Sequence, residues 1–127
     1  MRIEPSTLIY VDSSPGKGRG VFANVDIKKG QVIEVAPVLL MGSDEFHPEN
    51  HSNVGEYYVY YWDEDQVAIA LGYGSLYNHS FDPDADYEFD DDTITYIALR
   101  DIPAGQEIHI NYENDPEDQS PLGFDVV

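Results

Sequence analysis

The sequence predicts a mostly β fold, built from several small β-sheets with few short helices, in a single domain of residues 1–127. Short runs rich in β-branched and aromatic residues recur along the chain, and clusters of Gly, Pro, Asn, Asp and Ser separate them. No stretch keeps the apolar period of an amphipathic helix over three turns. Hydrophobic residues make up 42% of the chain, which is enough apolar surface for a core.

The β-prone runs give the expected strands in order. Pro37 lacks a backbone donor, so we expect the strand that contains it to lie at an edge or to bulge there. Three acids at Asp90, Asp91 and Asp92 separate two runs and predict a hairpin tip. The expected strands are residues 8–11, 20–23, 31–41, 57–62, 66–71, 85–89, 93–99 and 107–112.

One sequence pattern occurs twice, in residues 23–33 and 98–108. Both copies contain Ala, Asp-Ile, Gly-Gln and Ile at the same spacings. Each copy predicts a strand, a turn whose Gly takes a positive φ, and a second strand. We interpret the pair as two similar structural corners of one β domain.

The charge is strongly acidic, with 25 Asp and Glu against 6 Lys and Arg and a formal net charge of −19. Such a surface repels phosphates, so direct nucleic-acid binding is not expected. Two explanations of the acidity remain open: solubility in a salty cytoplasm, or attraction of a basic protein or peptide. Four of the basic residues gather near the N-terminus: Lys17, Arg19, Lys28 and Lys29.

No apolar run approaches the roughly 20 residues that a membrane span needs, so no membrane association is expected. The first residues contain an acid and no apolar run, unlike a signal peptide, which makes the cytoplasm the predicted location. The chain has no cysteine, which excludes disulfides and cysteine-ligated zinc. The sequence does not constrain the oligomeric state.

Two patterns imitate metal sites without completing them. The acids in residues 82–86 resemble the start of a calcium loop, but Tyr87 stands where that loop needs Gly. His47 and His51 have helical spacing, but Pro48 interrupts a helix and no third ligand follows. No metal site is predicted.

Two loop segments and the tyrosines could carry chemistry. The glycine-rich residues 16–20 let backbone N–H groups approach a ligand, although neither a dinucleotide fingerprint nor a P-loop is present. Residues 77–83 concentrate Asn, His and Ser, which offer paired donors and acceptors. The 10 tyrosines could line a narrow pocket and still present oxygen to a cationic substrate.

Taken in order, three of these segments resemble the motifs of the SET-domain family, and the resemblance spans residues 7–112. Residues 16–22 (GKGRGVF) are similar to its Gly-x-Gly motif. Residues 75–84 (SLYNHSFDPD) are similar to Arg-Phe-x-Asn-His-Ser-x-x-Pro-Asn, and residues 105–112 (GQEIHINY) to Gly-Glu-Glu-Leu-x-x-x-Tyr. The resemblance implies a SET-domain fold of small sheets around a knot-like C-terminal crossing.

The resemblance also implies an enzyme that transfers a methyl group from S-adenosylmethionine (AdoMet) to a lysine of a protein substrate. Tyr112 would be the catalytic tyrosine, and Tyr87 the second tyrosine of the lysine channel. The family's cofactor positions fall on Lys17, Gly18, Arg19, Asn78 and His79. The side chain of Lys17 or of Arg19 would neutralise the AdoMet carboxylate.

Some positions depart from the family pattern. Residues 34–37 (EVAP) stand where active members have Glu-Tyr-x-Gly, so we expect one channel tyrosine to be missing, at Val35. Asp84 replaces the usual Asn. In the absence of a cysteine-rich zinc segment, the acidic tail, residues 113–127, is expected to close the substrate channel with Leu122 and Phe124. A catalytically weak or inactive SET-fold module that binds basic peptides is the alternative.

Overall fold

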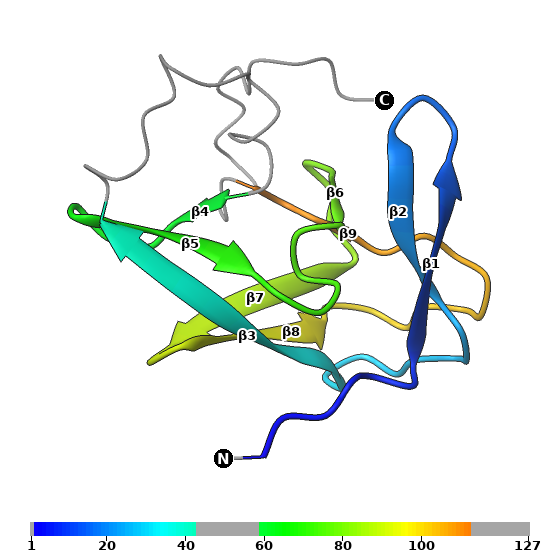
Figure 1. The fold of residues 1–127 in the computed structure, drawn as a ribbon. Helices are drawn as coiled ribbons and strands as arrows, with labels where there is room; N and C mark the ends of the chain where they lie inside the picture. Colours follow the sequence, from blue (N-terminus) through cyan, green and yellow to red (C-terminus); the bar gives the residue numbers. More distant parts are fainter. Residues whose placement is uncertain (1, 43–58, 113–127) are drawn as a thin grey trace.

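The computed structural model describes residues 2–42 and 59–112, and its regular structure there consists of β-strands without a helix. The mostly β prediction is therefore confirmed, whereas the expected short helices do not occur in these residues (Figure 1). None of these residues forms a helix long and apolar enough to cross a membrane. The strands are β1 (Ile9–Ser14), β2 (Gly18–Ala23), β3 (Val32–Gly42), β4 (Val59–Tyr61), β5 (Gln66–Ala70), β6 (Asn78–His79), β7 (Ala85–Asp90), β8 (Thr93–Ala98) and β9 (His109–Ile110).

The largest sheet has five strands in the order β4-β5-β3-β8-β7, all antiparallel. β3 is its central strand, so the expected edge position of Pro37 is wrong. Pro37 is tolerated because it lies where β3 changes partner: the pairing with β8 ends at Pro37, and the pairing with β5 begins at Val38. The bulge lies elsewhere, between Val32 and Glu34.

Two smaller sheets complete the described fold. β1 and β2 form an antiparallel hairpin, and β6 and β9 form a two-residue parallel pair. Figure 1 shows the hairpin on one side, the five-stranded sheet on the other, and the β6–β9 pair between them. The strand predicted at residues 107–112 is shorter than expected, because only β9, His109–Ile110, forms a strand there. The knot-like crossing stays a prediction.

The repeated sequence pattern proves to be two corners that bind each other. Ile27 and Ile102 exchange both backbone hydrogen bonds, at 2.9 and 2.8 Å. The acid of each copy accepts a backbone N–H from the other: Asp101 accepts from residue 29 at 2.9 Å, and Asp26 from residue 104 at 3.0 Å. Both turns have their Gly at a positive φ, +86° and +89°. This pairing fixes the β1–β2 hairpin to the C-terminal segment.

The strand registers place one face of the large sheet inward. Glu34, Tyr96 and Tyr87 are direct cross-strand partners and therefore share that face. All three are buried, and Ala36, two residues after Glu34, lies on the same side. The inner face is therefore rich in tyrosine where it approaches the β6–β9 pair.

Candidate functional site

The β6–β9 pair brings together two of the segments that the motifs singled out. Asn78 lies opposite His109, and His79 lies opposite Ile110. The next backbone N–H, of Ser80, donates to the carbonyl of Ile110 at 2.9 Å. The polar loop of residues 77–83 and the end of the C-terminal motif are therefore one structural unit.

The side chain of Asn78 is bound by two segments of the chain, and a third supports it through Glu107. Its side-chain amide donates to the carbonyl of Arg19 at 3.0 Å and to Oε2 of Glu107 at 2.7 Å. The other oxygen of Glu107 accepts the hydroxyl of Ser14 at 2.7 Å. A Cβ at Gly20 would collide with the carboxylate of Glu107 and lie 2.9 Å from the Asn78 amide, so this position has no room for a side chain. The first motif is thereby fixed against the second and third.

His79 is 3% exposed, and its Nδ1 accepts the backbone N–H of Tyr112 at 3.0 Å. Burial, followed by the charges of His109 and Lys17, lowers the pKa of His79, so the ring is neutral near pH 7. The ring of Phe81 is perpendicular to it, 4.4 Å between centroids. Nε2 has no hydrogen-bond partner within the part of the chain described here. The His79 side chain therefore positions Tyr112.

The two predicted catalytic tyrosines lie together. The Tyr112 hydroxyl donates to the backbone carbonyl of Tyr77 at 2.7 Å, and the Tyr87 hydroxyl donates to the carbonyl of Tyr112 at 3.0 Å. Tyr87 is 5% exposed. A hydroxyl that has given its proton to a carbonyl offers only its lone pairs to another group. Tyr112 can therefore orient an amine as an acceptor.

A cluster of three more tyrosines, Tyr60, Tyr77 and Tyr96, supports this pair, and of these only Tyr77 lies in a segment that the motifs marked. The hydroxyls of Tyr60 and Tyr96 lie 2.8 Å apart, and both bond the carbonyl of Gly74. Tyr60 contacts the Tyr87 ring edge-on, at 5.4 Å between centroids, and Tyr77 stacks on Tyr96. Burial raises the pKa values of all three phenols well above 10, so they are neutral near pH 7.

Lys17 belongs to a polar cluster beside the β6–β9 pair. Its Nζ lies 3.1 Å from Nε2 of His109, whose Nδ1 lies 3.1 Å from Oδ2 of Asp84. Asp84 is 5% exposed. By contrast, the Arg19 side chain is exposed, and its backbone carbonyl makes the contact with Asn78. His109 was not among the predicted site residues, because a single His within a strand carries no pattern of its own.

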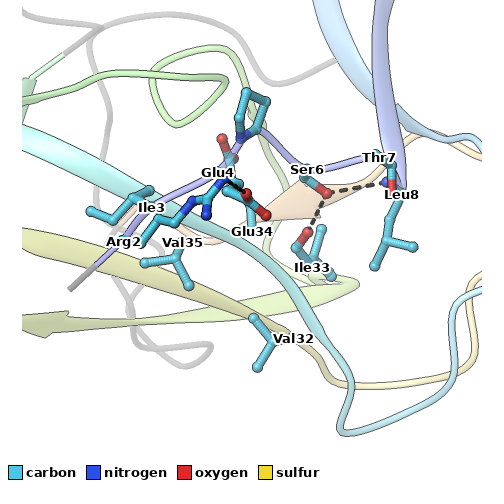
Figure 2. Close-up of a pocket in the computed structure, with 11 residues that line it drawn as sticks. Arg2, Ile3, Glu4, Ser6, Thr7, Leu8, Val32, Ile33, Glu34 and Val35 are labelled. Carbon is cyan, nitrogen blue, oxygen red and sulfur yellow. Dashed lines mark hydrogen bonds and ion pairs between the residues drawn. The ribbon is translucent and has the colours of Figure 1, made fainter.

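The structure corrects the expectation for Val35. Val35 pairs with Thr95 and lies on the outer face of β3, away from Tyr87 and Tyr112. It lines a cavity of about 510 Å³ beneath the N-terminal segment (Figure 2). Ala36, not Val35, lies on the tyrosine-lined face, so the position without a channel tyrosine moves by one residue. The cavity is lined by none of the predicted site residues; its lining is Arg2, Ile3, Glu4, Pro5, Ser6, Thr7, Leu8, Val32, Ile33, Glu34 and Val35.

Other predicted features remain without a structural outcome. Phe124 and Leu122 lie outside the described residues, as do His47 and His51. Residues 2–42 and 59–112 contain no group of three or more His, Asp and Glu that could hold a metal ion. The fold places Lys17, Arg19, Asn78, His79 and Tyr112 around one strand pair, with Tyr87 next to Tyr112.

Comparison with known proteins agrees with this geometry. The family model of the SET domain matches residues 18–113. A histone-lysine N-methyltransferase of Schizosaccharomyces pombe, described as specific for lysine 37 of histone H3, is 37% identical over 98 residues, which are 76% of this chain and 67% of the relative. A solved structure of a candidate histone methyltransferase from Plasmodium falciparum is 32% identical, with a TM-score of 0.67, over 82% of this chain and 96% of that one.

The chain belongs to the SET-domain family. The match begins at Gly18 and continues past Tyr112, so it contains both strands of the β6–β9 pair and the position predicted for the catalytic tyrosine. The relatives support the prediction that the protein is a methyltransferase, and the solved neighbour confirms the SET-domain fold.

Proposed function

We propose that this protein transfers a methyl group from AdoMet to a lysine side chain of a protein substrate. The observation that carries the proposal is the β6–β9 pair, which sets Tyr112 against the Asn78-His79 segment in a chain of the SET-domain family. Both segments are needed for the reaction, because one would hold the cofactor and the other would orient the amine.

The residues around this pair fit AdoMet in charge and in shape. The Lys17 ammonium could form an ion pair with the carboxylate of AdoMet, and the Asn78 side chain could form hydrogen bonds with its amino-acid end. Gly18 has φ +79° with nothing within 4 Å of a Cβ position, so its backbone is open to a ligand. Bound AdoMet would supply the electrophilic methyl group on its sulfonium.

The tyrosines account for the rest of the chemistry. A lysine ammonium has no lone pair and an ordinary pKa near ~10.4, so it must lose a proton before it attacks. Neutral phenols and buried rings around Tyr87 and Tyr60 form a weakly polar environment that favours the uncharged amine. The Tyr112 oxygen would then align the amine for in-line displacement, in a site from which water is excluded.

The proposed substrate is a lysine-containing, basic protein segment. The net charge of −19 favours such a partner over nucleic acid or an anionic membrane surface. The S. pombe relative is named for a lysine of a histone, a class of basic protein. A cytoplasmic location remains part of the proposal.

Two measurements test the proposal. Isothermal titration calorimetry with AdoMet should show saturable binding, and labelled AdoMet should transfer its methyl group to lysine in Lys/Arg-rich peptides. Absence of AdoMet binding would overturn the proposal.

Ala36 brings no hydroxyl to the tyrosine-lined face, which favours a second candidate, a SET-fold module that binds basic peptides without methylating them. Label transfer to any lysine peptide would exclude that module.

A further inference from the structure

Three side chains from distant parts of the chain form a line beside the β6–β9 pair. Lys17 comes from the glycine-rich loop, His109 from β9, and Asp84 from the segment before β7. Nζ of Lys17 and Nε2 of His109 are 3.1 Å apart, and Nδ1 of His109 and Oδ2 of Asp84 are also 3.1 Å apart. Both separations are within hydrogen-bond range.

The two ends of this line require the same tautomer of His109. An ammonium can only donate, so Nε2 must accept from Lys17 and carries no proton. An ionised carboxylate can only accept, so Nδ1 must carry the proton that it donates to Asp84. A His109 with protons on both nitrogens would turn an N–H toward the Lys17 ammonium. Oε1 of Glu107 is 3.7 Å from the same Nε2, which is beyond hydrogen-bond length.

Asp84 is built to hold this arrangement. Its Oδ2 also accepts the backbone N–H of His109 at 2.9 Å, and its Oδ1 accepts the side-chain amide of Gln106 at 3.0 Å. The guanidinium of Arg100 lies 3.7 Å from Oδ1. Each of these groups is a donor, so both oxygens of the Asp84 carboxylate accept hydrogen bonds. The buried Asp84 therefore fixes the orientation of the His109 ring.

We propose that His109, oriented by Asp84, is a positioning residue that holds the Lys17 ammonium at the glycine-rich loop to receive the AdoMet carboxylate. The inference rests on the proposed function for its ligand. The inference also selects Lys17 over Arg19 as the residue that binds the AdoMet carboxylate. The Arg19 side chain is exposed, whereas the Lys17 side chain is half-buried and hydrogen-bonded to His109, the residue that pairs with Asn78.

The tautomer tests the inference without any ligand. In a ¹⁵N–¹H correlation spectrum of the histidine rings near pH 7, His109 should appear neutral with its proton on Nδ1. The assignment comes from comparison with His109→Phe. A proton on Nε2, or on both nitrogens, would overturn the proposal, because Lys17 could then not donate to this ring.

Binding of two ligands tests the function of the line. AdoMet carries the carboxylate, whereas 5′-deoxy-5′-methylthioadenosine lacks the whole amino-acid end. Lys17→Met and His109→Phe should each weaken AdoMet binding by about tenfold, the loss of one charge-assisted hydrogen bond. Neither should change binding of the shorter ligand by more than about twofold. The double variant should bind AdoMet no worse than Lys17→Met, since His109 acts through Lys17.

The outcomes separate this inference from the proposed function. Equal weakening of both ligands by His109→Phe would assign it a general structural role and overturn the inference alone. Additive losses in the double variant would do the same. Wild-type protein that binds neither ligand would overturn the proposed function, even where the spectrum shows the expected tautomer. A thermal melt of each variant checks that it is folded.

Discussion

The side-chain amide of Asn78 donates to the carboxylate of Glu107 at 2.7 Å, and this contact ties two motifs together across the β6–β9 pair. The same carboxylate accepts the hydroxyl of Ser14, which is buried at the end of β1. Glu107 thus connects the hairpin, the Asn-His-Ser segment and the C-terminal motif. Its role is to orient Asn78, and it need not touch a ligand.

Replacement of Glu107 should therefore lower both the stability of the protein and its affinity for AdoMet. In Glu107→Ala, the Asn78 amide and the buried Ser14 hydroxyl both lose their acceptor, so we expect the free energy of unfolding to fall by about 1–3 kcal/mol. AdoMet affinity should fall as well, because Asn78 can rotate. Ser14→Ala is the matched control. It removes the hydrogen bond to the other oxygen of the Glu107 carboxylate, so it should lower stability and leave AdoMet affinity unchanged. Equal AdoMet affinities in both variants would contradict the assignment.

Loss of the Tyr112 hydroxyl should separate chemistry from binding. Tyr112→Phe keeps the ring and the backbone bond to His79, so AdoMet affinity should stay close to wild type. The lost hydrogen bond to the Tyr77 carbonyl should lower the free energy of unfolding by only about 0.5–1.5 kcal/mol. The rate of methyl transfer should fall by about 100-fold or more, because the amine is no longer aligned. Tyr10→Phe, on the β1–β2 hairpin, is the control and should leave the rate unchanged. A Tyr112→Phe rate within a factor of three of wild type would exclude this role.

The two paired corners should respond alike to mutation. Asp26 and Asp101 each accept one backbone N–H from the opposite copy. We expect Asp26→Ala and Asp101→Ala to lower the free energy of unfolding in urea by similar amounts, about 0.5–1.5 kcal/mol each. A ratio above about three between the two losses would mean that the corners are not equivalent.

The sequence predicted the fold class and the main segments because its local signals agreed with one another. The glycines at 30 and 105 both take the positive φ that the repeated pattern implied. The acidic tip at residues 90–92 does join β7 and β8, whose ladder ends at Asp90 and Thr93. The edge position predicted for Pro37 is wrong, because a strand that changes partner midway can hold a proline at its centre.

The site was predictable only where a motif marked it. Asn78, His79 and Tyr112 stand in recognisable segments, and the fold brings them together. Glu107 and His109 lie inside the third motif and Tyr60 lies outside all three, but each acts through partners far away in sequence, and no local pattern encodes such a contact. The face of Val35 could not be assigned either, because the bulge between Val32 and Glu34 shifts the strand's register.

The buried Glu34 should make stability depend on pH in an unusual direction. Burial raises its pKa above 4.5, although the Tyr73 N–H at 2.9 Å and the Tyr77 hydroxyl at 2.7 Å favour the charged form and partly oppose the shift. A group with a raised folded-state pKa contributes stability that is full below its unfolded-state pKa and is lost as pH rises through the folded-state pKa.

Glu34→Gln tests this dependence. The Gln oxygen can accept from the Tyr73 N–H, and its amide can donate to the Tyr77 hydroxyl, which turns to accept it. The free energy of unfolding of both proteins is measured in urea between pH 4 and pH 7. The difference, wild type minus Glu34→Gln, should be greatest at pH 4 and should fall as the pH rises. Each tenfold difference in proton affinity between folded and unfolded protein contributes about 1.4 kcal/mol. Parallel pH profiles for the two proteins would show that burial does not disfavour the charged Glu34.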